Sequence, residues 1–168
     1  KNAYALERAK NAGVQAEIRS PFSVLGKERA ENASRDEKRI AISDAILDLC
    51  RKNNIEAIVL AGYLSVLGGA IIEAYSGRII NLHPALLPKF GGVGMWGHHV
   101  HEAVKAAGDT ITGMTVHYVS PVCDGGDIIA QFSTSISPDD SVDDIAEKEH
   151  QLEMKHYPEV IETLLEKI

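Results

Sequence analysis

The sequence predicts an α/β domain built on a mostly parallel sheet with an antiparallel hairpin at its edge. Apolar runs over residues 56–62 and 78–84 are short and continuous, as in parallel strands covered on both faces. Segments with helical periodicity alternate with these runs, which is typical of α/β proteins. Residues 113–119 and 127–134 are two further β runs, and the loop between them is too long for a tight turn. These two runs predict the antiparallel pair.

The first forty residues predict a helix, a weak strand and a loop. Helix formers in residues 2–14 predict a helix that ends at Gly13, since glycine suits the position just past a helix end. Residues 14–18, VQAEI, predict a weak strand. Residues 21–33 are polar and predict a loop.

The remaining helices are predicted from caps and apolar spacing. Ser34 and Glu37 have the spacing of a capping box, and an apolar stripe follows over residues 38–54. A short helix interrupted by glycine is expected in residues 65–77, and another helix in residues 99–109. The chain closes with a helix within residues 137–168, where acidic residues of the first turn complement the helix dipole and Pro158 marks a break or kink.

Length, composition and charge limit the classes of function. A chain of 168 residues with 45% hydrophobic content suits one domain, residues 1–168. The formal net charge of -7 argues against nucleic-acid and membrane-surface partners, which require clustered basic residues. Cys50 and Cys123 have no metal-like spacing and favour a reduced compartment. No apolar run reaches the roughly 20 residues of a membrane span, and the opening residues lack a signal-peptide apolar region. We therefore expect a cytoplasmic protein.

The segment RIINLHPALLPKF contains the strongest candidate site. Side chains alternate along a strand, so Asn81 and His83 share one face at the end of an apolar run. Pro84 favours an extended backbone at the preceding histidine. Amide and imidazole N–H groups can both donate to an oxygen on which negative charge develops, and a histidine can also move a proton near neutral pH. Asp124, in the glycine-flanked loop VCDGGD, is the best candidate to orient the imidazole.

These and neighbouring residues also have other interpretations. An Asn turn, a core histidine and an ordinary loop aspartate would explain Asn81, His83 and Asp124 without function. Gly92, Gly94 and Gly97 match the dinucleotide fingerprint in spacing, but no strand runs directly into them. The residues GGVGMWG predict a flexible or substrate-covering loop instead.

Histidines elsewhere in the chain predict no metal site. His98 and His101 would share one side of a helix, and His99 lies between them, but no further ligands complete a coordination set. Surface or loop histidines are the favoured interpretation. His117 alternates along a strand and is a candidate to support Asp124, although a packed strand histidine is the commoner case.

The motifs NLHPALLPKF, TGMTVHYV and CDGGDIIAQ resemble the folate-dependent formyltransferases. ERAKNAGV, AIVLAGYLSVL and AYSGRIINLHPALLPKF resemble the same family in order and spacing, so the resemblance covers nearly the whole chain. Within the family, the segments are most similar to the enzymes that formylate glycinamide ribonucleotide in purine biosynthesis. The resemblance implies a Rossmann-like formyltransferase fold.

The resemblance implies transfer of the formyl group of 10-formyltetrahydrofolate, a cosubstrate, to the amine of glycinamide ribonucleotide, without a metal. His83 would act as general acid and base, Asn81 would polarise the formyl oxygen, and Asp124 would raise the pKa of His83 and help to deprotonate the amine. The implied folate contacts are Arg39, Leu64, Ser65, Val66, Leu67, Ser120, Pro121, Val122 and Cys123. The implied acceptor contacts are Pro84, His150 and Glu153. For Arg39 and Glu153, a solvated helix face is the alternative.

The acceptor and the class of function have competing interpretations. Relatives that act on methionyl-tRNA, and hydrolases of 10-formyltetrahydrofolate, share the Asn-x-His arrangement. A proline directly after the histidine, as at Pro84, resembles the pattern of the glycinamide enzymes. An acidic chain also lacks the basic surface that a tRNA substrate would favour. A truncated or inactive relative that only binds folate is the other alternative. We expect small-molecule substrates and a monomer or homodimer.

The sequence departs from the pattern of the family it resembles at two places. The family opens with a strand, a Gly-Ser-Asn phosphate loop and a helix, and the chain lacks this first strand-loop-helix unit. Residues 1–168 are therefore expected to be an N-terminally incomplete domain of a longer protein. The loop at residues 91–99 is longer than in the most familiar members, and it lies over the implied acceptor site.

Overall fold

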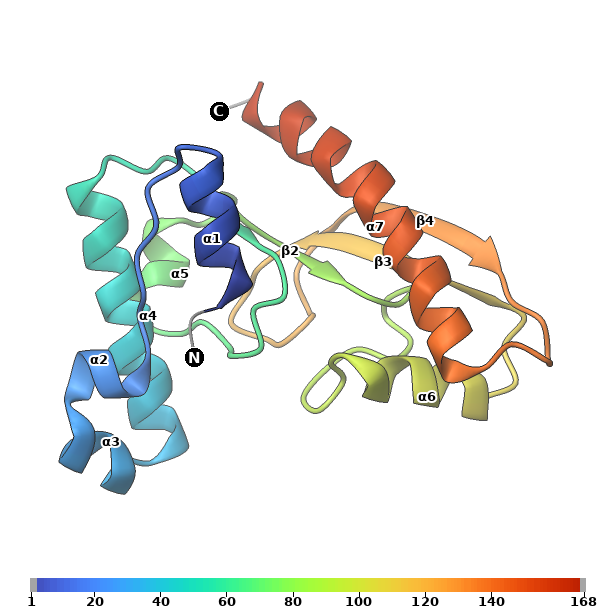
Figure 1. Ribbon diagram of the computed structural model, residues 1–168, viewed down its shortest axis with the longest axis horizontal. Coiled ribbons are helices and arrows are strands. Elements are labelled where there is room, and N and C mark those ends of the chain that lie inside the picture. Colours follow the sequence, from blue (N-terminus) through green and yellow to red (C-terminus); the bar gives the residue numbers. More distant parts are fainter. Residues whose placement is uncertain (1–2, 167–168) are drawn as a thin grey trace.

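The computed structural model describes residues 3–166, and helices and strands alternate between residues 35 and 118 (Figure 1). This alternation confirms the α/β class. The helices are α1 (Tyr4–Asn11), α2 (Pro21–Leu25), α3 (Lys27–Asn32), α4 (Arg35–Lys52), α5 (Ala70–Ala74), α6 (His98–Ala106) and α7 (Val142–Leu165). The strands are β1 (Ile58–Leu60), β2 (Ile79–His83), β3 (Ile111–Tyr118) and β4 (Ile128–Ser135).

The four strands form one sheet in the order β1-β2-β3-β4. β1 and β2 are parallel, with Leu60 paired to Asn81. β3 is antiparallel to β2, and β4 is antiparallel to β3 at the sheet edge, so the predicted hairpin is confirmed. In the described residues, the parallel part of this mixed sheet is the β1–β2 pair.

The two faces of the sheet are covered by different helices. Ile79 packs with residues of α4 and α5, including Leu47 and Ile71, in one core cluster. Ile80 faces the other way and packs in a second cluster that includes Tyr157 of α7. Asn81 and His83 alternate with Ile80, so their side chains lie on the face away from α7. In Figure 1, α7 runs across β3 and β4, and α4 and α5 lie to the left of β2.

Local capping explains where the predicted helix α4 begins. Ser34 Oγ accepts a hydrogen bond from the Glu37 backbone N–H, and the Glu37 carboxylate accepts one from the Ser34 N–H. The capping box predicted from the sequence is therefore confirmed. The helices expected near residues 2–14, 65–77 and 99–109 are also present as α1, α5 and α6.

Two local predictions were wrong. Residues 14–18 form no strand, because no neighbouring strand pairs with them within the described residues, and Val14 and Ile18 are exposed. The predicted loop at 21–33 contains α2 and α3 instead. Ser20 and Ser23 cap α2 reciprocally, a serine variant of the capping box. Pro158 was expected to mark a break or kink, and α7 continues through this residue without a break.

Parts of two predictions lie outside the described residues. The first helix was expected to include Asn2, and the last helix to extend to Ile168, and neither residue is described.

Cys50 and Cys123 are both free thiols, and Cys50 is buried. Within residues 3–166, none of the helices is both long and apolar enough to cross a membrane.

Candidate active site

Two polar side chains at the end of β2 lie in a largely buried part of the sheet. Asn81 and His83 point to the same face, as their spacing predicted. The strand register places His117 directly opposite Asn81, and Thr115 directly opposite His83. His83, Thr115 and His117 are almost fully buried. A cluster of polar groups is therefore held on rigid strands instead of on loops.

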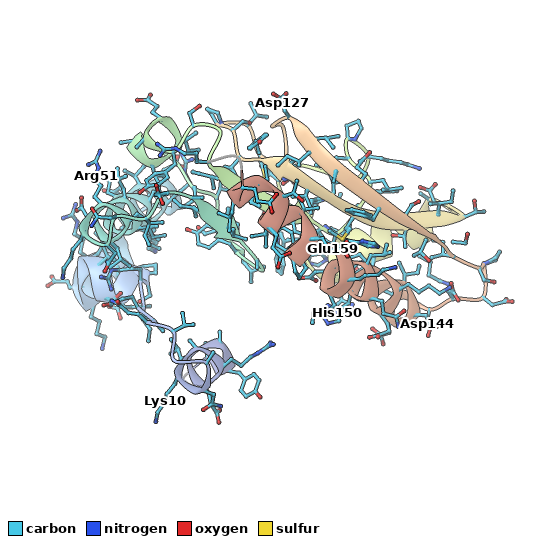
Figure 2. All side chains as sticks on the ribbon, turned by 90° about the horizontal axis from the view of Figure 1, so that it is seen from above. Lys10, Arg51, Asp127, Asp144, His150 and Glu159 are labelled. Carbon is cyan, nitrogen blue, oxygen red and sulfur yellow. The ribbon has the colours of Figure 1, made fainter. Side chains whose placement is uncertain are left out.

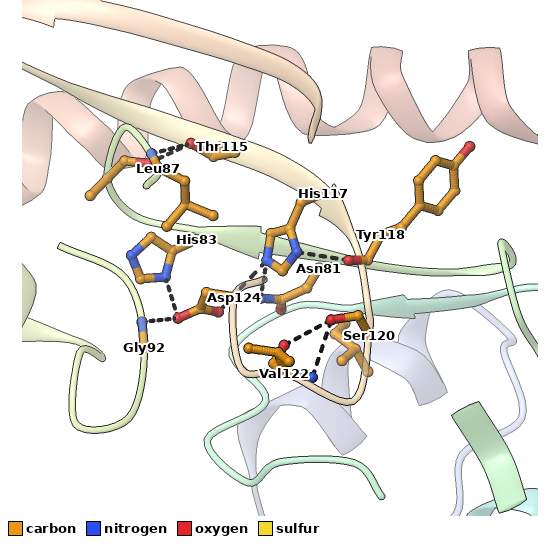
Figure 3. A network of polar contacts seen from close by, with 12 residues as sticks. Asn81, His83, Leu87, Gly92, Thr115, His117, Tyr118, Ser120, Val122 and Asp124 are labelled. Carbon is orange, nitrogen blue, oxygen red and sulfur yellow. Dashed lines mark hydrogen bonds and ion pairs between the residues drawn. The ribbon is translucent and has the colours of Figure 1, made fainter. Parts of the chain in front are cut away.

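Asp124 reaches this cluster from the loop between β3 and β4. Its Oδ2 lies 3.5 Å from His83 Nδ1, and its Oδ1 lies 3.7 Å from His117 Nε2. The same Oδ2 accepts a hydrogen bond of 2.8 Å from the Gly92 backbone N–H. Figure 3 shows the carboxylate between the two imidazoles. The structure thus brings Asn81, His83 and Asp124 together.

Backbone geometry brings the Asp124 loop over the sheet. Asp124 has a φ of 53°, in the left-handed region, which aspartate adopts more readily than most residues. Gly126 lies so close to the preceding strand that an added Cβ would be 1.7 Å from the Tyr118 carbonyl oxygen. Glycine at this position is therefore required for the loop to fold back toward β2.

The contacts of His83 determine its tautomer. His83 Nε2 lies 2.8 Å from the Phe90 carbonyl oxygen, which can only accept, so Nε2 carries the hydrogen. The lone pair of Nδ1 then faces Asp124, and a second proton would be added there. Burial lowers the pKa of His83, and the neighbouring Asp124 carboxylate opposes this shift. The resting imidazole is neutral, next to a group that stabilises its charged form.

Asn81 is oriented by His117. His117 Nδ1 donates to the Tyr118 carbonyl oxygen over 2.9 Å, which leaves Nε2 as an acceptor. Asn81 Nδ2 lies 3.2 Å from this nitrogen and donates to it. This contact orients the amide and occupies one of the two Nδ2 hydrogens, so the other can donate to a ligand.

The predicted folate contacts on one side follow β1. Leu64, Ser65 and Val66 are exposed, whereas Leu67 is buried in the core cluster of α4 and α5. Because β1 and β2 are parallel neighbours, the loop after β1 lies at the same end of the sheet as His83, where both strands finish. This end is where ligands usually bind in α/β sheets.

Arg39 of α4 lies beside this loop. A Cβ added at Gly68 would be 2.5 Å from the Arg39 guanidinium, and Ser43 Oγ accepts a hydrogen bond from the Gly68 N–H. Arg39 Nε lies 3.3 Å from Asp36 Oδ1 without the geometry of a hydrogen bond. The structure thus brings Arg39 to the stretch that contains the other predicted folate contacts.

The predicted contacts between β3 and β4 form a tight turn next to Asp124. Ser120 Oγ donates to the Val122 carbonyl oxygen and accepts from the Val122 N–H. Pro121 and Val122 are exposed, and Cys123 is half-buried directly before Asp124. Burial raises the pKa of the Cys123 thiol, and the Asp124 carboxylate adds to this shift.

The predicted acceptor contacts are divided between the site and α7. Pro84 directly follows His83, whereas His150 and Glu153 lie on α7 and contact each other, with 3.2 Å between His150 Nδ1 and Glu153 Oε2. Within residues 3–166, no hydrogen bond or ion pair connects this pair to Asn81, His83 or Asp124. Figure 2 labels His150 on α7.

The remaining candidate motifs have other contacts. In the described residues, no group of three or more His, Cys, Asp or Glu side chains is placed to bind a metal. His98 lies 3.7 Å from Asp143, and His99 lies 3.3 Å from Glu102, while His101 is buried. The glycine loop at 91–97 is connected to Asp124 through the Gly92 N–H.

Several residues of the site were not predicted from the sequence. The backbone of Phe90 contacts His83, and the backbone of Gly92 contacts Asp124. Thr115 and Gln131 bind the backbone of Leu87, in the turn that follows His83. His117 was predicted to support Asp124, and its hydrogen bond to Asn81 was missed. The period-two alternation of TGMTVHYV gave one available signal, since it places Thr115 and His117 on the same face.

The chain is similar to known proteins in both sequence and fold. Residues 4–161 match the family described as formyl transferase, and the chain belongs to this family. Individual relatives are phosphoribosylglycinamide formyltransferases. That of Bacillus subtilis is 42% identical over 129 residues, and the match covers 77% of this chain and 64% of the relative. That of Haemophilus influenzae is 33% identical over 165 residues, which cover 98% of this chain and 70% of the relative.

Solved structures of similar proteins agree with the fold. Phosphoribosylglycinamide formyltransferase from Streptococcus pneumoniae has a TM-score of 0.79 and 33% identity, with 98% of this chain and 82% of that chain covered. Glycinamide ribonucleotide transformylase 1 from Symbiobacterium toebii has a TM-score of 0.80 and 31% identity, with 96% and 68% covered. The chain spans 64% of the length of the Bacillus subtilis relative and 41% of the chloroplastic relative from Arabidopsis thaliana.

Proposed function

We propose that the chain transfers the formyl group of 10-formyltetrahydrofolate to the amine of glycinamide ribonucleotide. The observation that carries this proposal is the convergence of Asn81, His83 and Asp124 at the end of β2. The family and the names of the relatives support the same reaction. The amine nitrogen forms a bond to the formyl carbon, the bond from that carbon to N10 of the folate breaks, and one proton moves from the amine to N10.

Asn81 stabilises the negative charge that develops on the formyl oxygen. One Nδ2 hydrogen is held by His117, and the other donates to the oxygen as the tetrahedral intermediate forms. Because His117 fixes the amide before the substrates bind, little reorganisation is needed during the reaction. One such donor is worth roughly 10²- to 10³-fold in kcat.

His83 and Asp124 move the proton. In the present arrangement, His83 Nε2–H donates to the Phe90 carbonyl oxygen. When the folate binds, the formyl group replaces this carbonyl as the partner of Nε2. The Asp124 carboxylate, 3.5 Å from Nδ1, stabilises the imidazolium and helps to take the proton from the amine. His83 then delivers a proton to N10.

The reduced folate binds between the loop after β1 and the loop after β3. Leu64 and Val122 are 72% and 68% exposed, and such exposed apolar side chains suit a flat, partly apolar ring. Arg39 supplies a positive charge beside the first of these loops. In this arrangement Ser65, Val66, Ser120, Pro121 and Cys123 line the folate site, and Leu67 supports it from the core.

The acceptor binds next to Pro84, with the His150–Glu153 pair as its contact on α7. Tyr157, one helical turn after Glu153, donates a hydrogen bond of 2.7 Å to the Leu60 carbonyl oxygen at the end of β1. This bond brings the middle of α7 to the carboxyl ends of β1 and β2, where the site lies. A carboxylate and an imidazole there suit the hydroxyl groups of a ribose.

Formyl transfer, followed optically with glycinamide ribonucleotide present and then omitted, tests this proposal. We expect turnover that depends on the acceptor. Turnover without the acceptor would contradict a transferase and indicate hydrolysis of 10-formyltetrahydrofolate. Folate binding without any turnover would contradict the proposed activity for this chain and indicate a binding-only relative.

A further inference from the structure

The Thr115 hydroxyl lies at the centre of a buried hydrogen-bond network beside His83. Thr115 is fully buried and is paired with His83 in the β2–β3 register. Its Oγ1 donates to the Ala85 carbonyl oxygen over 2.6 Å and accepts from the Leu87 N–H over 3.0 Å. One side chain therefore holds two backbone groups of the turn that follows His83.

Gln131 completes this network from the neighbouring strand. It is paired with Thr115 in the β3–β4 register. Its Nε2 donates to the Leu87 carbonyl oxygen over 2.9 Å and to Thr115 Oγ1 over 3.0 Å. Both backbone groups of Leu87 are thus bound by side chains of the hairpin. Figure 3 shows Leu87 joined to Thr115 on the His83 side of the sheet.

The turn held in this way returns to the active site. Leu87 is buried, and a Cβ added at Gly91 would be 2.5 Å from its side chain, so Leu87 and Gly91 are in close contact. On either side of Gly91, the Phe90 carbonyl oxygen contacts His83 and the Gly92 N–H contacts Asp124. The position of Leu87 therefore affects backbone groups that contact both His83 and Asp124.

We propose that Thr115, assisted by Gln131, is a positioning residue for His83 and Asp124 in formyl transfer. This inference rests on the proposed function. The hydroxyl and the amide touch neither the reacting atoms nor His83 itself, and they act through the backbone of residues 85–92. Hydrogen bonds with fixed directions set this backbone more narrowly than apolar packing of the same volume would. A displacement of about 1 Å at a reacting group can cost roughly 100-fold in rate.

Substitutions on β3 test this role with a matched control. Thr115→Val keeps the shape of the side chain and removes the hydroxyl, while Thr115→Ser keeps the hydroxyl. Thr112→Val is the control, because Thr112 lies on the same strand, is 2% exposed, and has no hydrogen-bond partner for its hydroxyl within residues 3–166. Gln131→Met removes two hydrogen bonds at an exposed position, where the fold tolerates a change.

The kinetic result expected is a selective loss of kcat. Thr115→Val should lower kcat about tenfold or more and change the KM for 10-formyltetrahydrofolate less than about threefold. Gln131→Met should lower kcat in the same way by a smaller factor, and Thr115→Ser and Thr112→Val should match the unchanged chain. Equal kcat values for Thr115→Val and Thr112→Val would overturn the proposal. If Thr115→Val does not fold, an unchanged kcat for Gln131→Met would overturn it.

A titration of the His83 imidazole by NMR separates this inference from the proposed function. In Thr115→Val, we expect a looser turn to change the burial of His83 and its contacts with the Phe90 carbonyl oxygen and Asp124, so the pKa of His83 should differ from that in the unchanged chain, and it should not move in Thr112→Val. No formyl transfer by the unchanged chain would contradict the proposed function alone. An unchanged His83 titration in both Thr115→Val and Gln131→Met would contradict the positioning role, whatever the activity.

Discussion

Asn81 and His117 face each other across the β2–β3 ladder, with 3.2 Å between Asn81 Nδ2 and His117 Nε2. The Tyr118 carbonyl oxygen fixes the His117 tautomer, and His117 in turn fixes the direction of the Asn81 amide. The group that we propose to stabilise the formyl oxygen is therefore oriented by the sheet itself.

Replacement of His117 should weaken catalysis through Asn81. Without the imidazole the Asn81 amide can rotate, and His117→Leu should lower kcat for formyl transfer about tenfold, whereas Asn81→Ala should lower it roughly 100-fold or more. The double variant should be no slower than Asn81→Ala, because residues that act as one unit are not additive. Steady-state kinetics of the three variants check this. Fully additive losses would show that His117 acts independently of Asn81.

Removal of the Asp124 charge should lower the pKa of His83 further. Burial already lowers this pKa, and the Asp124 carboxylate opposes the shift, so Asp124→Asn removes the opposing cause. NMR titration of the His83 ring should show a lower pKa than in the unchanged chain. Asp127→Asn, an exposed acid of the same loop, controls for net charge. A His83 pKa that is unchanged in Asp124→Asn would contradict the contact between these residues.

Glu149 should make the fold less stable as the pH rises. This side chain is buried on α7, and burial raises its pKa to about 8, with the nearby Glu153 adding to the shift. The folded chain therefore favours the protonated carboxyl group. The contribution of Glu149 to the free energy of unfolding is complete below its pKa in the unfolded chain, near 4.5, and is lost as the pH rises through about 8.

Glu149→Gln should remove this pH dependence. At pH 8 it should raise the free energy of unfolding by about 4 kcal/mol, since the pKa rises from 4.5 to about 8 and one pKa unit corresponds to about 1.4 kcal/mol, and the gain should vanish near pH 4.5. Denaturant unfolding at several pH values measures the difference. Glu147→Gln, an exposed change two residues earlier, is the control. An equal gain at pH 4.5 and pH 8 would contradict a titrating Glu149.

Gly126→Ala should displace the Asp124 loop. The added Cβ would lie 1.7 Å from the Tyr118 carbonyl oxygen, which cannot move without breaking the end of β3. We expect a loss of about 2 kcal/mol in stability, as in overpacked sites, together with strongly reduced formyl transfer. Thermal unfolding and activity measure both effects. If Gly126→Ala were as stable and active as Asp127→Ala, the loop would not need this close approach.

Signals that are local in sequence predicted much of the structure. Ser34 and Glu37 predicted where α4 begins, because both partners of a capping box lie within four residues. Strand alternation and Pro84 likewise predicted that Asn81 and His83 share a face. The serine cap of α2 was missed because Ser23, and not a glutamate, occupies the third helical position.

Features that depend on strand pairing could not be predicted in the same way. Thr115 and Gln131 meet the turn after His83 only because β2, β3 and β4 pair in one register, and a shift of one residue would turn these side chains to the other face. Residues 14–18 show the converse case. Their alternating pattern predicts a strand, but a strand also needs a neighbour, and none pairs with them in the described residues.

The most direct test of the central claim is His83→Ala, measured for both formyl transfer to glycinamide ribonucleotide and affinity for 10-formyltetrahydrofolate. Because the proposed role of His83 belongs to the transition state, the rate should fall by roughly 1,000-fold or more while the Kd of the folate changes little. Comparable losses of rate and folate affinity would contradict this account and make His83 a binding residue.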